Sequence, residues 1–207
     1  MDTDSSTTSS KYGSVAQAFH WVTAIAVLAA FMLGPGGSEQ HVYAASKDFG
    51  RQLHETLGLI VFALSLLRML WRTIDTHPQP VPLAPLMAFT AKAVQAALYC
   101  LLFAVPLTAI LGAWFEGHPL TFLAGLQVSA PFGAAHPVGV ALAAIHTWLG
   151  DGILWLAGFH ALAAIFHHVF LQDGVLSAML PTRIARAIEL RSGRTRMKRP
   201  LGRASRT

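Results

Sequence analysis

Four long apolar segments separate polar stretches along the chain. The segments are continuously apolar instead of alternating, which argues against membrane strands. Each is near or above the roughly 20 residues that a helix needs to cross a bilayer. The pattern therefore predicts an all-α integral membrane protein, a four-helix bundle with spans at residues 15–34, 52–72, 92–114 and 145–171.

The polar stretches divide the chain into three regions. We expect a disordered polar tail at 1–14, a four-helix transmembrane domain at 15–172 and a basic cytoplasmic tail at 173–207. Within the domain, a Pro-rich linker at 77–82 joins the second and third spans.

Composition agrees with a membrane protein. Hydrophobic residues make up 54% of the chain and charged residues 12%, whereas soluble domains have about 25% charged residues. The net charge of +5 comes from basic residues beside the spans, which favours contact with anionic membrane lipid over nucleic acid. A single cysteine, Cys100, and the lack of a C-x-x-C-H motif exclude an intrachain disulfide and c-type haem attachment.

The distribution of Lys and Arg predicts the orientation. Thirteen of these residues lie in the two tails or, as Arg68, Arg72 and Lys92, at the span ends beside the loop after the second span, and two lie in the other loops. By the positive-inside rule, both termini are cytoplasmic. A cleaved signal peptide is the competing interpretation of the first span, because Val42-Tyr43-Ala44-Ala45 resembles a cleavage site; the acidic N-terminal region argues against it.

Histidines in or beside the spans are the candidate functional residues, since ionisable groups at membrane depth are costly. His146 and His160 are 14 residues apart on the fourth span, within about 40° of one face and separated by a rise of roughly 21 Å. His54 is level with His146, and His20 lies at the depth of the lower part of the fourth span. Two histidine pairs at two depths are what two stacked b haems require, because each iron takes two axial imidazoles.

Several assignments stay open at this level. His167 shares the face of His160 and is an equal candidate from spacing. Arg68 lies 14 residues after His54 and is either a partner of a haem propionate or a plain arginine at the end of a span. Close approach of a flat ring or ordinary helix packing would equally explain the neighbouring glycines Gly58, Gly150, Gly152 and Gly158.

A haem-free transporter and purely structural histidines are the alternatives to haem. A proton or cation path normally includes carboxylates deep in the membrane. Here Glu55, Glu116 and Asp151 all lie near the outer edge of the predicted bundle, which disfavours a transporter.

The chain resembles the bacterial cytochrome b561 family, which includes the cytochrome b subunits of nickel–iron hydrogenases. The resemblance covers all four spans. It rests on FHWVTAIAVL at 19–28, LHETLGLIVFALSLLRMLWR at 53–72, ALYCLLFAVPLTAILG at 97–112 and HTWLGDGILWLAGFHALAAIFHHVFLQDGVLSAMLP at 146–181.

The resemblance implies two haem b groups between the helices. It implies that His54 and His146 ligate the outer haem iron and that His20 and His160 ligate the inner one, which selects His160 over His167. Arg68 is then a cofactor-binding residue beside the inner haem.

The resemblance also implies an electron-transfer role in the bacterial inner membrane. The expected redox partners are a quinone and an outer-face donor or acceptor, which makes the chain an electron-transfer cytochrome or a quinone-linked oxidoreductase. Some family members oxidise superoxide, but the outer loops carry only Lys47 and Arg51 against four acidic residues and offer no positive field to steer an anion. The alternative is a membrane-anchor cytochrome b subunit bound to a partner protein, in a larger dehydrogenase or hydrogenase complex.

Overall fold

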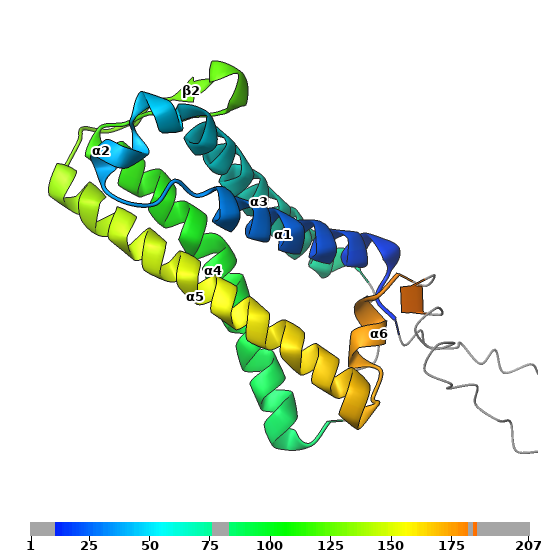
Figure 1. Ribbon diagram of the computed structural model, residues 1–207. Coiled ribbons are helices and arrows are strands. Elements are labelled where there is room, and N and C mark those ends of the chain that lie inside the picture. The colour runs from blue at the N-terminus through cyan, green and yellow to red at the C-terminus, as the bar shows by residue number, and fades with distance from the viewer. Residues whose placement is uncertain (1–10, 76–82, 182–183, 186–207) are drawn as a thin grey trace, which may run out of the picture.

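The computed structural model describes residues 11–75, 83–181 and 184–185, and within them four helices are long and apolar enough to cross a membrane (Figure 1). The predicted all-α four-helix membrane bundle is thus confirmed. The first ten residues of the predicted N-terminal tail, the linker at 77–82 and the basic stretch 186–207 lie outside the described residues. The spanning helices are α1 (Ser14–Leu33), α3 (Asp48–Ile74), α4 (Pro85–Glu116) and α5 (His136–Phe166).

Two of the helices begin well before the apolar segments that predicted them. α4 begins at Pro85 instead of residue 92, and α5 begins at His136 instead of residue 145. A proline lies in the first turn of both helices, where its fixed φ and missing N–H are tolerated. Hydropathy marks only the part of a helix that contacts lipid, whereas backbone hydrogen bonding continues beyond it.

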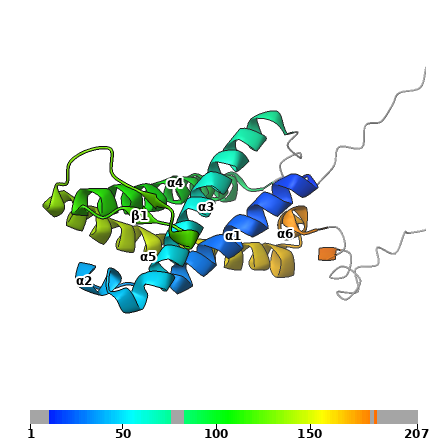
Figure 2. The ribbon, with the colours of Figure 1, turned by 90° about the horizontal axis from the view of Figure 1, so that it is seen from above.

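The helices associate as two pairs. α1 packs along α3 and α4 packs along α5, while α1 and α5 touch at few places (Figures 1 and 2). Each helix contributes one buried residue to a shared central layer: Ala26, Val61, Leu102 and Ile153. This layer is where the two pairs meet.

Glycines bring α4 and α5 into close contact. A Cβ atom added at Gly139 would lie 2.5 Å from the backbone nitrogen of Glu116 and 2.9 Å from the carbonyl oxygen of Gly112. A Cβ at Gly112 would lie 3.3 Å from the backbone nitrogen of Ala143. Only residues without a side chain allow this crossing, which fixes Glu116 against the first turns of α5.

We expect Gly139→Ala to destabilise the bundle by about 1–3 kcal/mol, because the added methyl forces α4 and α5 apart. A lower Tm of the purified protein in detergent would report it. Gly50→Ala is the matched control, since Gly50 is also helical and its added Cβ would meet nothing within 4 Å. Equal Tm values for the two variants would contradict the close crossing.

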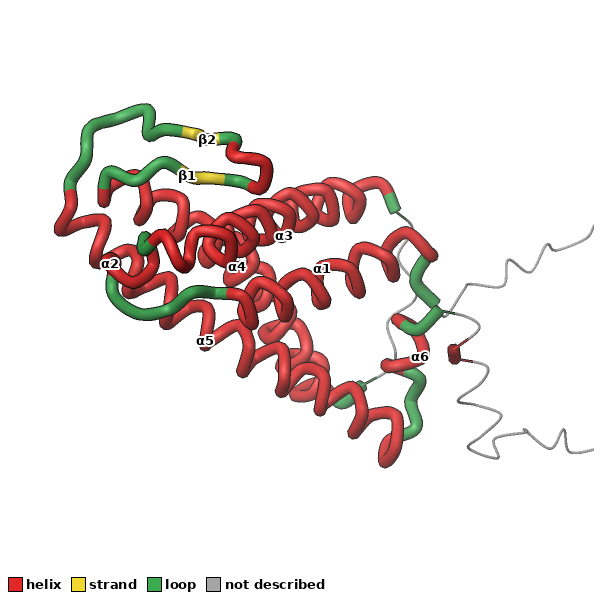
Figure 3. The backbone as a smooth tube through the Cα atoms, turned by 45° about the horizontal axis from the view of Figure 1, so that its top comes forward, coloured by secondary structure: helices red, strands yellow, loops and turns green. Residues whose placement is uncertain are grey.

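One end of the bundle, the hairpin end, carries most of the short elements (Figure 3). They are α2 (Glu39–Val42), a 3-10 turn (Ala45–Lys47), and the antiparallel strands β1 (Leu120–Thr121) and β2 (Gln127–Val128), which flank a second 3-10 turn (Leu123–Gly125). The hairpin is tied to α3, because the N–H of Thr121 donates to Glu55 and that of Leu123 to Thr56 Oγ1. Strands of two residues are too short to leave an alternating pattern in the sequence.

The opposite end, the termini end, carries the short helix α6 (Val175–Met179). A π-helical turn (His167–Leu171) extends α5 and leads the chain back toward α1. There Trp21 Nε1 donates to the carbonyl of Met179 at 2.9 Å, and Gln17 Nε2 donates to that of Ala178 at 3.2 Å. These bonds dock α6 against the first turns of α1.

Candidate functional site

Two of the four candidate histidines face each other near the hairpin end. The ring centres of His54 on α3 and His146 on α5 are 6.0 Å apart, with the rings at 83° to each other. His54 Nδ1 lies 2.8 Å from the carbonyl oxygen of Ala30, and His146 Nδ1 lies 2.9 Å from that of Val105. Since a carbonyl only accepts, Nδ1 is the donor in each contact, and in the neutral imidazole the free lone pair is then on Nε2.

The other two candidate histidines face each other near the termini end. The ring centres of His20 on α1 and His160 on α5 are 6.5 Å apart at an interplanar angle of 71°. Trp21 contacts the edge of His20, with ring centres 5.3 Å apart. The ring of His167, the alternative to His160, is instead hydrogen-bonded through Nδ1 to the carboxylate of Asp173.

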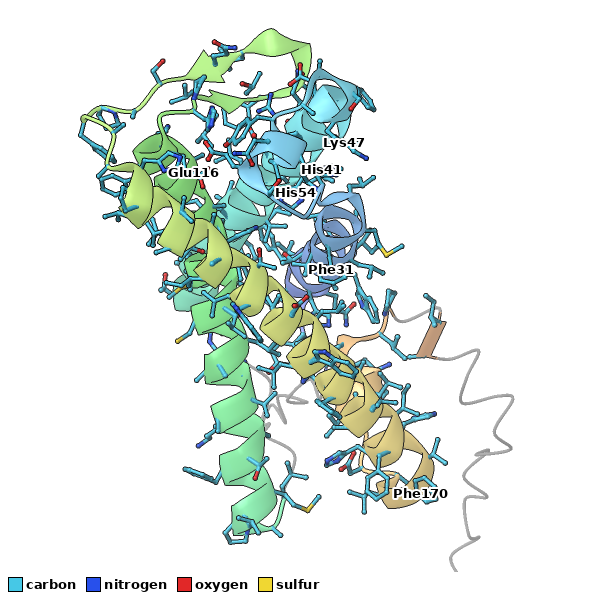
Figure 4. The ribbon with its side chains drawn as sticks, turned by 60° about the vertical axis from the view of Figure 1, so that its left-hand side comes forward. Phe31, His41, Lys47, His54, Glu116 and Phe170 are labelled. Atoms are coloured by element: carbon cyan, nitrogen blue, oxygen red, sulfur yellow. The ribbon has the colours of Figure 1, made fainter. Side chains whose placement is uncertain are left out.

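The two pairs lie at different depths in the bundle. Ile153 of the central layer is seven residues from His146 and seven residues from His160. The helical rise separates the two pairs by roughly 21 Å along α5. Figure 4 shows His54 toward the hairpin end of the bundle and Phe170 at the other end.

Arg68 lies at the level of the termini-end pair. Its guanidinium carbon is 5.4 Å from the centre of the Tyr99 ring, within cation–π distance. Its charge also acts on both His20 and His160. The arrangement places a permanent positive charge beside this pair of imidazoles.

A small cavity of about 40 Å³ opens beside Arg68. The buried indole Nε1 of Trp71, which contributes to the lining, has no hydrogen-bond partner among the residues that the structure describes. An unpaired buried donor next to arginines suits an anionic or carbonyl-bearing group. The cavity is lined by Tyr12, Ala16, Arg68, Trp71, Arg72, Asp75, Gln95, Tyr99 and Met179.

The glycines near the histidines have open space around them, unlike Gly139, which is in close contact with a neighbouring helix. A Cβ added at Gly58, one turn after His54, or at Gly150, one turn after His146, would meet nothing within 4 Å. Helix packing therefore does not account for them, although it accounts for Gly139. Both open positions lie on the histidine faces of their helices, so they fit a large flat group between α3 and α5.

Positive charge at the hairpin end is largely neutralised. Arg51 is 8% exposed and donates to the carboxylates of both Asp48 and Glu55. Its guanidinium also lies 5.1 Å from the centre of the Tyr43 ring. Of the two basic residues expected on this side, only Lys47 is exposed.

A second group of titratable residues, which the sequence did not indicate, gathers at the hairpin end. His118 Nε2 and His136 Nε2 lie 2.8 and 2.9 Å from the two carboxylate oxygens of Glu39. Hydrogen bonds from these two histidines lower the pKa of Glu39, so its carboxylate is ionised at neutral pH. The three residues are far apart in sequence, and no spacing rule relates them.

Comparison with known proteins assigns a family to this arrangement. The model of a family described as prokaryotic cytochrome b561 matches residues 11–182. Cytochrome b561 homolog 2 of Escherichia coli (strain K12) is 31% identical over 84% of this chain and 93% of its own length. Cytochrome b561 homolog 1 of the same organism is 30% identical over 79% of this chain and 93% of its own. A protein named probable superoxide oxidase CybB, from Yersinia pestis, is 25% identical over 83% of this chain and 96% of its own.

Proposed function

The chain belongs to the prokaryotic cytochrome b561 family, and we propose that it carries electrons across the bacterial inner membrane between a quinone and a donor or acceptor on the outer side. Haem binding and electron transport follow from the family. The proposal adds two haem b groups, the route across the bilayer and the redox partners. The observation that carries it is the pair of facing histidine sets at two depths along α5.

We assign His54 and His146 to one haem iron and His20 and His160 to the other. A metal–imidazole nitrogen bond is about 2.0 Å long, so two imidazoles on opposite sides of one ion have their ring centres about 6 Å apart. The observed separations of 6.0 and 6.5 Å support this assignment. Further support comes from the carbonyls of Ala30 and Val105, which hold Nδ1 as the donor and leave Nε2 available as the ligand atom.

Ligation by two histidines favours electron transfer over oxygen chemistry. Haem would supply a one-electron redox centre, and with both histidines of a pair as its ligands it would have no open coordination position. The helices supply the ligand nitrogens, an apolar surrounding and a fixed spacing between the two sites. His146 and His160 of α5 would thus define a relay with one centre toward each membrane surface.

We propose that Arg68 pairs with a propionate of the termini-end haem. Its charge acts on both histidines of that pair, and the neighbouring Trp71 N–H is an unpaired donor at the same cavity. Arginine suits this role because its planar fork of donors matches a carboxylate. Its contact with Tyr99 keeps the guanidinium on the α4 side of the pair.

We propose that the hairpin end faces the outside of the cell and that both termini are cytoplasmic. The excess of Lys and Arg in the tails and in the parts of α3 and α4 nearest the termini end (Arg68, Arg72 and Lys92) supports this orientation. The hairpin-end haem would then exchange electrons with the outer donor or acceptor.

Superoxide is a poor candidate for that outer donor. Steering an anion to the surface requires a positive field, but Arg51 is neutralised by Asp48 and Glu55. Glu39 and Glu116 add negative charge nearby. The outer surface therefore favours a neutral or cationic partner.

Electron transfer across the membrane is testable in liposomes that contain the purified protein and trapped ferricyanide. We expect added short-chain ubiquinol to reduce the trapped ferricyanide much faster than in protein-free liposomes. His146→Ala should lower the rate to the protein-free background, because it removes one centre of the relay. Absorbance of the ferricyanide measures the rate.

His41→Ala is the control, since His41 is exposed near the hairpin end and belongs to neither pair. It should keep the wild-type rate. A wild-type rate no higher than the rate in protein-free liposomes would refute the proposal that this chain alone transfers electrons from a quinol across the membrane. Activity that appears only after a partner dehydrogenase is added would support the membrane-anchor alternative.

A further inference from the structure

The hairpin end carries a second set of metal-type ligands outside the haem-ligand candidates. One ligand atom each from Glu39, Glu116 and His118 lie within 4.8 Å of one another. They come from α2, from the last residue of α4 and from the turn that follows α4. His136, the first residue of α5, approaches from a fourth direction, with Nε2 at 2.9 Å from Glu39.

Local backbone structure directs these side chains toward one another. Gly117 ends α4 in the left-handed region at φ 94°, and the N–H of His118 returns to the carbonyl of Ala113 at 2.9 Å. This turn, which glycine favours, folds His118 back over the end of α4. The ring of Tyr43 stacks on His118 with centres 3.5 Å apart, which holds the imidazole in one orientation.

The start of α5 is fixed in the same way. The N–H of Ala135 donates to the carbonyl of Phe115 at 2.9 Å, and the close approach at Gly139 holds Glu116 against α5. His136 and Glu116 are therefore positioned by backbone contacts and not only by their own side chains. The ligand set is largely preformed.

The charge of the set calls for a cation. The half-buried Glu116 carboxylate accepts no hydrogen bond from any described residue, yet it lies beside the carboxylate of Glu39. Arg51 is occupied by Asp48 and Glu55. Figure 4 shows Lys47 well apart from Glu116 at this end of the bundle.

We propose that Glu39, Glu116 and His118, with His136 as a fourth ligand, bind one divalent transition-metal ion of the Zn²⁺ type. Two imidazoles and two carboxylates suit Zn²⁺, Cu²⁺ or Ni²⁺, whereas Ca²⁺ and Mg²⁺ prefer oxygen ligands alone. The ligand atoms of Glu39, Glu116 and His118 already lie within 4.8 Å of one another, and side-chain rotations that bring them and His136 to bonds of about 2.0–2.2 Å would close the set. Zn²⁺ would bind the lone pair of each Nε2, so each imidazole would keep its single proton on Nδ1 and release any second proton to the solvent.

Bound metal would clamp the segment between α1 and α3 onto the ends of α4 and α5. The ligands span three separate parts of the chain, so the ion binds the folded protein and not the unfolded chain. Binding of this kind raises the unfolding temperature by mass action. The site is independent of the proposed haem ligands, since it shares no residue with them.

The test uses the full-length haem-loaded protein, freed of metal with EDTA and titrated with Zn²⁺. We expect one Zn²⁺ per chain by equilibrium dialysis and a Tm raised by several degrees in Zn²⁺ but not in Mg²⁺. Glu39→Gln and His118→Ala should each weaken Zn²⁺ binding about tenfold or more and abolish the rise in Tm. An unchanged haem spectrum in each variant reports that the bundle is intact.

His41→Ala is the matched control, because His41 also belongs to α2 but lies outside the ligand set. It should bind Zn²⁺ like wild type. The proposal would be overturned if the wild-type protein showed no saturable Zn²⁺ binding in the micromolar range. Binding that survives both Glu39→Gln and His118→Ala would overturn it as well, since the ion would then be held at other surface groups.

Discussion

His146→Ala is expected to lose the hairpin-end haem and to keep the other, halving the haem content per chain. The substitution removes one of two axial ligands, and His54 cannot replace it because each imidazole offers a single Nε2. Haem quantified per chain, with the reduced-minus-oxidised spectrum of the purified protein, measures the loss. A remaining five-coordinate haem with a high-spin spectrum would be an equally direct sign of the lost ligand.

His160→Ala should give the complementary result at the termini end, with the hairpin-end haem retained. His167→Ala is the control, because its ring is bonded to Asp173 and lies outside the facing pair. It should keep full haem content. Loss of a haem in His167→Ala, with none lost in His160→Ala, would move the ligand assignment to His167.

Gly58→Phe is expected to remove the hairpin-end haem without unfolding the protein. A Cβ added at this position would meet nothing within 4 Å, so a larger side chain can start into open space. The phenyl ring would fill the volume beside His54 that we assign to the haem. The haem content should fall to about half, as in His146→Ala, while the Tm of the haem-free protein stays unchanged.

Leu59→Phe is the control for added bulk on the same helix. Leu59 is 42% exposed and points about 140° away from His54 around α3. It should retain full haem content. A Gly58→Phe variant that binds as much haem as wild type would show that the open space at Gly58 is not haem volume.

The four spans could be predicted from the sequence because lipid imposes its requirement on each helix separately. A span needs only enough apolar residues in one run, and all backbone hydrogen bonds close within the helix. The candidate histidines followed from the same logic, since 14 residues on one helix fix both a face and a depth. The structure brings His54 to His146 and His20 to His160, and their role as haem ligands stays a prediction.

The helix starts were less predictable than the spans. Pro85 and His136 precede the apolar segments, and nothing in hydropathy requires a helix to stop where lipid contact stops. The hairpin was not predicted either, because each of its two strands has only two residues, which is a single period of alternation and too short to recognise.

By itself, the sequence determined that the protein is a membrane helix bundle and which histidines could act at two depths, because both follow from periodicity within single helices. Only the tertiary structure decided which glycines allow close helix packing. Gly139 lies against the backbone of Glu116, whereas Gly58 and Gly150 have no neighbouring atom within 4 Å of an added Cβ. The tertiary structure alone brought Glu39 to His118 across 79 positions of sequence. Such contacts depend on which helices pair and how closely they cross, and no local pattern encodes that.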